Sequence, residues 1–229
     1  MGQLGGQGSV LSPGDMQLGR GETIADTARV LSRFLDVIVL RTGTDENLRE
    51  LAKWSTVPVI NGLTPISHPI QILADVLTFE EHRGPIAGKT LAWIGDGNNV
   101  ATSLMEAAAL LKFNVRLATP EGFAPSERAV AWARQNGASI EVFQNPAEAV
   151  VGADAVLTDT WVSMGDKDRD QRLSAFRPYQ VDAALMAKAA PNALFLHCLP
   201  AHIGEEVTAE VFESPASVVF DEAENRLHT

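Results

Sequence analysis

The sequence is short of cysteine and of basic residues, and each shortage excludes a class of protein. Cys198 is the only cysteine among 229 residues, so no internal disulfide can form. Lysine and arginine number 18 against 29 acidic residues, which gives a net charge of −11. This balance argues against a surface for nucleic acid or for an anionic membrane. An anionic ligand would need a locally positive site, built from a few arginines and helix N-termini.

Targeting signals and long apolar runs are also missing. The sequence has no signal peptide and no apolar stretch of membrane-spanning length, so we expect a cytoplasmic protein. Hydrophobic residues make up 45% of the chain, enough to bury a sizeable core in one large or two modest domains. The sequence looks truncated at both ends. Residues 1–7 are not typical of the start of a folded domain, and residues 227–229 follow no obvious terminal helix. We therefore expect a fragment of a longer protein.

Short apolar runs alternate with amphipathic patterns along the whole chain. Helical spacing predicts helices over 25–35, 44–54, from Pro69 to about Gly84, and over 101–111, 126–135, 147–151 and 182–190. The apolar runs predict strands over 37–40, 57–60, 90–94, 114–118, 139–143, 155–158, 193–200 and 217–220. The alternation predicts an α/β fold with two doubly wound lobes of mostly parallel open sheets. The breakers Gly84, Pro85 and Gly88 indicate a boundary, and we expect domains over 1–80 and 81–229.

The stretch 193–200 carries the most informative chemistry. Four apolar residues lead into His197 and Cys198, and Pro200 then ends the strand because it cannot donate to a sheet ladder. A short run of this kind is typical of a strand buried on both faces in a parallel sheet. Ligands bind outside the carboxyl ends of such strands. The alternative is a core histidine beside a small buried thiol.

Polar residues follow most of the predicted strands, and this contrast with the apolar strands indicates a site at one sheet edge. The set comprises Arg41, Asn61, Asp96 to Asn99, Thr119, Asp159, His197 and Cys198. Each member also has a structural explanation. Arg41 could be a solvated surface cation, Asp159 could cap the next turn, and Asn98 and Asn99 could be turn residues.

Gly95 and Gly97 follow a strand and suggest a dinucleotide-binding turn. The third glycine of that fingerprint is replaced by Val100, and Thr119 rather than an acidic residue follows the next strand. Both departures argue against a nicotinamide-dependent dehydrogenase.

His68 lies at the start of the helix that Pro69 opens. The helix dipole disfavours a protonated imidazole there, so a neutral ring could donate to a carbonyl oxygen. Gln71, one turn on, lies on the same face and could bind an amide group. A surface histidine acting as a weak cap is the alternative.

Six strings together resemble the ornithine carbamoyltransferase family, in the right order and over essentially the whole chain. They are Asp26-Thr27-Ala28-Arg29, His68-Pro69-Ile70-Gln71, Gly95-Asp96-Gly97-Asn98-Asn99, Asp159-Thr160-Trp161-Val162-Ser163-Met164-Gly165, His197-Cys198-Leu199-Pro200 and Glu222-Ala223-Glu224-Asn225-Arg226. The aspartate-specific relatives typically have proline in place of Cys198 and lack the Ser163-Met164-Gly165 string.

The resemblance implies transfer of the carbamoyl group from carbamoyl phosphate to the δ-amine of L-ornithine, giving L-citrulline and phosphate. It implies no metal and no organic cofactor, a homotrimer, and a place in arginine biosynthesis. Residues 1–80 would be part of the carbamoyl-phosphate-binding domain, and 81–229 the ornithine-binding domain.

The resemblance also implies roles for single residues. Carbamoyl phosphate would be contacted by Arg41, His68, Gln71, Arg226 and the backbone of Cys198 and Leu199. The amino-acid part of ornithine would be held by Asn99, Asp159, Ser163 and Met164, with Cys198 beside the δ-amine. His68, Cys198, Asp159 and Arg41 are the residues we expect to be catalytic.

The residue types suit this chemistry. An alkyl ammonium with a pKa near 10.4, as in lysine, must lose a proton before it can attack. A thiol at the amine can favour its neutral form by position, and donors around the carbonyl stabilise the oxyanion of the tetrahedral intermediate. Phosphate is already a good leaving group.

The family's main phosphate-binding string, Ser-Thr-Arg-Thr-Arg, precedes a stretch like Gln3 to Gly6, and nothing here precedes Met1. The closing C-terminal helix, expected just after Thr229, is also missing. An inactive fragment that only binds ornithine or assembles with other subunits is therefore the alternative function.

Overall fold

The structure, a computed structural model, describes residues 2–12, 21–162 and 168–229. The chain divides into two compact units, Met1–Thr64 and Pro65–Thr229. Among the described residues, no helix is both long enough and apolar enough to cross a membrane.

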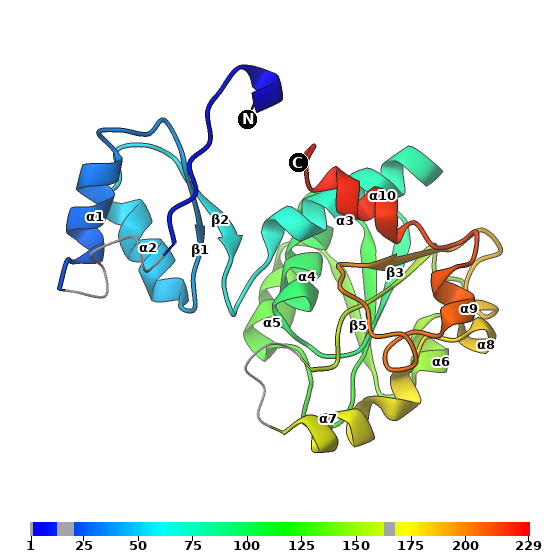
Figure 1. Cartoon of the computed structure of the whole chain (residues 1–229). Helices are drawn as coiled ribbons and strands as arrows, with labels where there is room; N and C mark the ends of the chain where they lie inside the picture. The colour runs from blue at the N-terminus through cyan, green and yellow to red at the C-terminus, as the bar shows by residue number, and fades with distance from the viewer. Residues whose placement is uncertain (1, 13–20, 163–167) are drawn as a thin grey trace. The chain divides into compact units, whose positions relative to one another are not determined.

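The first unit is a two-stranded parallel sheet accompanied by two helices (Figure 1). Its elements are a 3₁₀ turn at Gly2–Leu4, α1 (Ile24–Leu31), β1 (Ile38–Arg41), α2 (Asp45–Trp54) and β2 (Val59–Leu63). Both helices begin at a threonine whose hydroxyl accepts a backbone N–H: Thr23 from Asp26, and Thr44 from Asn47. The buried apolar core is small and consists of Ala28, Ile38 and Leu51.

The second unit is a five-stranded parallel sheet in the order β5-β4-β3-β6-β7. The strands are β3 (Thr90–Ile94), β4 (Asn114–Ala118), β5 (Ser139–Phe143), β6 (Ala155–Thr158) and β7 (Leu194–His197). The helices are α3 (Pro69–Arg83), α4 (Asn99–Leu111), α5 (Glu127–Gln135), α6 (Pro146–Ala149), α7 (Arg169–Phe176), α8 (Ala183–Met186), α9 (Ala209–Phe212) and α10 (Val219–Asn225), with a 3₁₀ turn at Arg177–Tyr179. The predicted α/β fold with parallel sheets is confirmed.

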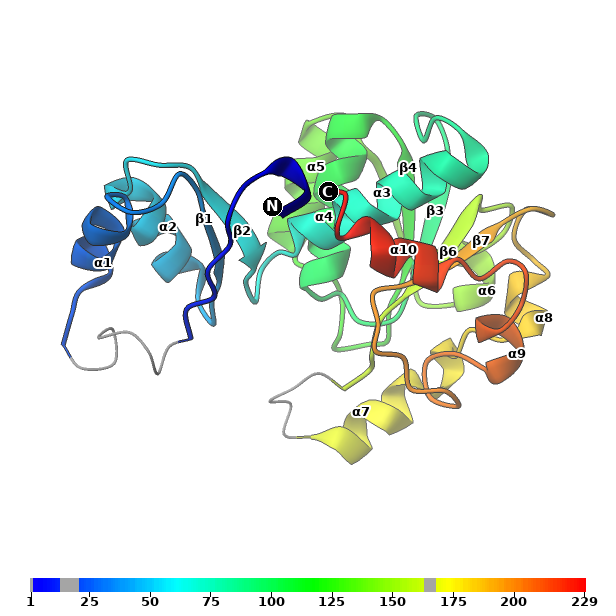
Figure 2. The ribbon, with the colours of Figure 1, turned by 45° about the horizontal axis from the view of Figure 1, so that its top comes forward.

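Alternating side chains build a separate core on each face of this sheet. On β7, Leu194 and Leu196 join the core formed with α3, α4 and α5, whereas Phe195 joins the core formed with α6, α8 and α9. Both faces are therefore covered, which explains why β6 and β7 are apolar and buried throughout. Figure 2 shows α10 beside α3, the pair of helices that brings the two ends of this unit together.

Two predicted elements differ from the structure for identifiable reasons. The strand predicted over 217–220 is wrong: Ser217 forms one isolated bridge to Phe195, and α10 begins at Val219. A four-residue apolar run does not distinguish strand from helix, and Asp221 and Glu222 favour a helix by their place in its first turn.

The helix predicted over 182–190 is shorter, and α8 ends at Met186. The carbonyl of Lys188 instead accepts from Gly152 N at 3.0 Å, and Ala190 N donates to Ala153 O at 2.9 Å. These bonds tie the segment to the start of β6. Three further predicted bounds shift: α1 ends at Leu31, β2 begins at Val59, and β7 ends at His197.

Candidate active site

The site lies where the strand order of the second unit reverses. β4 follows β3 on one side of it, and β6 returns to its other side, so the ends of β3, β6 and β7 lie next to each other. In open parallel sheets this reversal point opens the crevice that binds the ligand. The sequence placed polar residues at these ends, and the structure brings Asn98, Asp159 and Cys198 into contact there.

Asp159 is the centre of these contacts. Its Oδ1 accepts from Cys198 Sγ at 2.8 Å and from Thr160 N at 2.7 Å, and its Oδ2 accepts from Asn98 Nδ2 at 2.9 Å. Burial and the Asp159 carboxylate raise the pKa of the Cys198 thiol well above its usual value. The thiol therefore keeps its proton at neutral pH and acts as a hydrogen-bond donor.

Asn98, considered above as a turn residue, orients Asp159. As the N-cap of α4 its Oδ1 accepts from Val100 N at 3.0 Å and Ala101 N at 3.1 Å, which leaves Nδ2 to face the carboxylate. Asn99, predicted to hold substrate, is the first residue of α4. Asn98 lies after a predicted strand and directly before a helical pattern, and this position in the sequence indicates a helix N-cap.

His197 is held entirely by protein groups, in line with the core-histidine alternative. Its Nδ1 accepts from Leu199 N at 2.9 Å, so the ring proton lies on Nε2, which donates to Glu206 Oε1 at 3.1 Å. Its backbone N–H donates to Glu222 Oε2 at 2.8 Å. Leu199, which makes this bond, has φ 53°, in the left-handed region.

Gln71 is completely buried, and its amide joins α3 to α10. Nε2 donates to Asp75 Oδ1 and to Glu222 Oε1, each at 2.8 Å. Oε1 accepts from Arg226 at 3.3 Å, and the same arginine donates to Cys198 O at 2.7 Å. A network of side chains thus links Gln71 and Arg226 to the backbone of Cys198.

Asp75 and Glu222 form a buried carboxyl pair within this network. Burial raises the pKa of Asp75 to about 6, and burial together with the adjacent Asp75 raises the pKa of Glu222 well above its usual value. The pair is hydrogen-bonded, with the proton on Glu222, because two adjacent buried carboxylates cannot both ionise.

The remaining predicted residues are placed as follows. His68 immediately precedes α3, with Pro69 as its first residue, and the backbone N–H of His68 donates to Ser103 Oγ at 2.8 Å. Arg41 ends β1 in the first unit, where it is exposed. Ser163 and Met164 lie outside the described residues.

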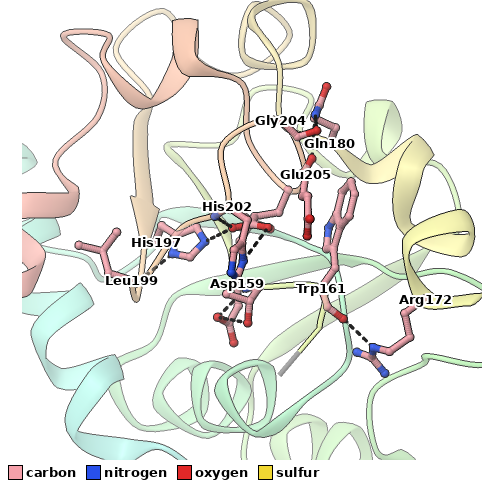
Figure 3. Close-up of polar contacts among 12 residues, drawn as sticks. Asp159, Trp161, Arg172, Gln180, His197, Leu199, His202, Gly204 and Glu205 are labelled. Carbon is pink, nitrogen blue, oxygen red and sulfur yellow. Dashed lines mark hydrogen bonds and ion pairs between the residues drawn. The ribbon is translucent and has the colours of Figure 1, made fainter. Parts of the chain in front are cut away.

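Arg172 on α7 was missed, and it secures the neighbourhood of the site. It forms an ion pair with Asp96 after β3 and donates to Trp161 O at 2.6 Å (Figure 3). Its guanidinium also lies 4.8 Å and 5.2 Å from the ring centres of Phe123 and Phe176. No strong helical pattern marks this segment, so the arginine gave no sequence signal.

Gly97 has a packing explanation that replaces the dinucleotide reading of its turn. A Cβ at Gly97 would lie 2.2 Å from Pro125 N, and its own N–H donates to Phe123 O at 2.9 Å. Because Gly97 has no side chain, the backbone of residues 123–125 can pack directly against it.

Asp159, His197 and Cys198 offer ligand atoms within 4.8 Å of one another, as a metal site would require. Both ring nitrogens of His197 are, however, engaged by Leu199 and Glu206. The ring would have to give up one of these bonds to bind a metal ion, so this group does not fit one as it stands.

Two family models match the chain. "Aspartate/ornithine carbamoyltransferase, carbamoyl-P binding domain" covers residues 1–81, and "Aspartate/ornithine carbamoyltransferase, Asp/Orn binding domain" covers 87–229. The chain belongs to the aspartate/ornithine carbamoyltransferase family. The domain boundary that we predict near residue 80 stays a prediction, since the compact units divide at Thr64 while the family models divide after residue 81.

Relatives within the aspartate/ornithine carbamoyltransferase family are similar over the whole chain. Ornithine carbamoyltransferase of Brucella abortus is 62% identical over 228 residues, which cover 100% of this chain and 73% of the relative. That of Rhodopseudomonas palustris is 60% identical with the same coverage. The solved ornithine carbamoyltransferase of Pyrococcus furiosus has a TM-score of 0.94 and 51% identity, and covers 100% of this chain and 74% of its own. That of Thermus thermophilus has a TM-score of 0.86 and 42% identity, over 95% of this chain and 72% of its own.

Proposed function

We propose that the chain transfers the carbamoyl group from carbamoyl phosphate to the δ-amine of L-ornithine, giving L-citrulline and phosphate. The observation that carries the proposal is the protonated Cys198 thiol on Asp159, at the reversal point of the sheet. The relatives named ornithine carbamoyltransferase support the choice of ornithine over other amines.

Asp159 and Cys198 would receive ornithine. The Asp159 carboxylate, oriented by Asn98, would attract the α-ammonium, with Asn99, Ser163 and Met164 beside the amino-acid part. Cys198 would lie at the δ-amine. A neutral thiol does not stabilise an ammonium ion as a thiolate would, so it favours the uncharged amine that can attack.

Carbamoyl phosphate would be held by His68, Arg226 and Arg41, with the backbone of Cys198 and Leu199 near the carbamoyl end. Gln71 is fully buried and donates its amide hydrogens to Asp75 and Glu222, so it would act by positioning Arg226. Arg226 is already positioned by Gln71 and by Cys198 O. Its remaining N–H groups would stabilise charge on the carbonyl oxygen or on the leaving phosphate. Placement and charge stabilisation would supply most of the rate, because phosphate leaves readily.

The wider setting is part of the same proposal. We infer a homotrimer in the cytoplasm that serves arginine biosynthesis, needs no metal or organic cofactor for this reaction, and binds carbamoyl phosphate through residues 1–80 and ornithine through 81–229.

The test is a citrulline assay of the purified chain with carbamoyl phosphate and L-ornithine, with L-aspartate as the competing acceptor. Asp159→Asn should lower kcat/KM for ornithine about 10- to 100-fold, the value of one charge-assisted contact. Asp154→Asn is the matched control, because Asp154 lies just before the opposite end of β6 and should leave the rate unchanged. Carbamoylation of aspartate, or ornithine binding without citrulline, would contradict the proposal.

A further inference from the structure

A second group of metal-ligand side chains lies on the turn that follows Pro200. One ring nitrogen of His202 and one carboxylate oxygen each of Glu205 and Glu206 lie within 4.8 Å of one another. Glu206 is fully buried, Glu205 is partly buried and His202 is exposed, so the group opens to solvent on the His202 side. Figure 3 shows His202 and Glu205 on this turn, with His202 beside His197 at the end of β7.

Glu206 uses only one of its two carboxylate oxygens within the protein. Oε1 accepts from His202 N at 2.5 Å and from His197 Nε2 at 3.1 Å. Oε2 is buried and has no hydrogen-bond partner within the described part of the chain, and it lies 3.8 Å from His202 Nδ1. A fully buried oxygen without a donor destabilises the fold unless a cation or a proton faces it.

Glu205 repeats this arrangement. Its Oε1 pairs with Arg169 Nη2 at 2.5 Å, whereas its Oε2 is buried and makes no hydrogen bond to any described residue. Each glutamate is thus held by one oxygen and keeps the other unused, beside an imidazole at the surface. Metal ligands are oriented in this way, by hydrogen bonds to the groups that do not coordinate.

We propose that His202, Glu205 and Glu206 bind a divalent transition-metal ion of the zinc type. One imidazole and two carboxylates suit such an ion, and their charge of −2 balances it. Bonds of about 2.1 Å in tetrahedral geometry place ligand atoms roughly 3.4 Å apart, so the 3.8 Å contact needs to close only slightly. The fourth position, on the exposed side, takes water.

This site is separate from the proposed carbamoyl transfer and is tested by metal binding alone. The full chain, freed of metal and carrying Cys198→Ser, is titrated with Zn²⁺ by calorimetry and with Co²⁺ by visible spectroscopy. We expect one bound ion, a raised melting temperature, and a cobalt spectrum without a thiolate charge-transfer band. Removing Cys198 ensures that its thiol does not contribute.

Two variants and one control locate the site. His202→Ala and Glu205→Gln should each weaken Zn²⁺ binding at least about 10-fold, and should remove the metal-dependent rise in melting temperature. Both side chains reach solvent, so melting in the absence of metal should change little. His228→Ala is the matched control: His228 Nε2 lies 3.8 Å from Glu224 Oε1 in an exposed pair that no third ligand joins within the described residues.

Three results would overturn the proposal: no ion bound by the Cys198→Ser chain, unchanged affinity in both variants, or equal loss in His228→Ala. The first result would leave His202 and Glu206 as a simple ion pair.

Discussion

Cys198 illustrates how one proton sets the character of a side chain. The thiol is partly exposed at the end of β7, yet burial of its sulfur and the adjacent Asp159 raise its pKa. A thiolate in this position would repel Asp159 and attract an ammonium ion. The protonated thiol does neither, so it serves as a neutral neighbour for an amine.

We predict that Cys198 reacts slowly with iodoacetamide at pH 8, because only the thiolate attacks and little is present. Asp159→Asn removes one of the causes of the raised pKa and should accelerate alkylation several-fold. The rate is followed by mass spectrometry, with Asp154→Asn as the control. Equal or slower alkylation of Asp159→Asn would show that the carboxylate does not hold the proton on sulfur.

Gly97 lacks a side chain where the backbone at Pro125 packs closely against it. Gly97→Ala would press a methyl group against the backbone at Pro125, which no rotamer change can relieve. We predict a loss of about 1–3 kcal/mol in the free energy of unfolding, measured by urea denaturation. Gly43→Ala meets no atom within 4 Å and should stay within about 0.5 kcal/mol of the unchanged chain. Equal stability of the two variants would contradict the packing explanation.

At the scale of elements, the contact between α3 and α10 depends on buried polar groups. Asn225 of α10 donates to Thr78 Oγ1 at 2.9 Å, and Glu222 of α10 accepts from Gln71 at 2.8 Å. The Asp75–Glu222 pair adds one shared proton to these bonds. The contact is therefore specific in geometry and sensitive to pH.

The sign of this sensitivity follows from the raised pKa values. An aspartate in the unfolded chain loses its proton near pH 3.8, but Asp75 keeps its proton in the folded protein up to about pH 6. Between these values the folded state binds more protons, so stability falls as pH rises. The pKa of Glu222 is also raised, so its titration lowers stability in the same direction as pH rises.

We predict that Asp75→Asn reduces this pH dependence, because an asparagine amide replaces the shared proton with a permanent donor to Glu222. The difference in melting temperature between pH 4.5 and pH 7 should shrink relative to the unchanged chain. Glu224→Gln, an exposed change on α10, is the control. An undiminished difference in Asp75→Asn would refute the shared proton.

At the scale of the whole molecule, the two units have very different cores. Two large apolar cores lie within residues 65–229, one on each face of the five-stranded sheet. Within its described residues, the first unit buries three apolar side chains beside its two strands: Ala28, Ile38 and Leu51. A two-stranded sheet with so little buried surface is marginal by itself.

We predict that residues 65–229 expressed alone fold and melt cooperatively, whereas residues 1–64 alone do not. Circular dichroism and thermal melting of the two fragments, beside the full chain, measure this. A non-cooperative transition in the longer fragment would show that its cores do not suffice.

The sequence predicts what depends on neighbouring residues and misses what depends on distant ones. The strands 90–94, 114–118, 139–143 and 155–158 match the structure. Residues 155–158 are buried along the whole strand, whereas burial alternates along β4 and most of β5, at the sheet edge, is exposed. Asp159 and Cys198 were identified because they are polar residues that directly follow apolar strands. Asn98 was named among the strand-end residues, but its contact with Asp159 was missed, as was Arg172, because their partners lie 61 and 76 residues away. The run at 217–220 misled because its helix is stabilised by contacts with α3.

The contact between α3 and α10 also determines when the site can form during synthesis of the chain. The hydrogen bond from Gln71 to Glu222 spans 151 residues, so α3 leaves the ribosome long before its partner exists. Until then Asp75 has no partner on α10 to share a proton with and stays hydrated. The arrival of α10 completes the arrangement of Gln71 and of Arg226 at Cys198. The chemistry is therefore assembled only after α10 has been synthesised, and a nascent chain halted before residue 219 would carry the sheet without a finished site.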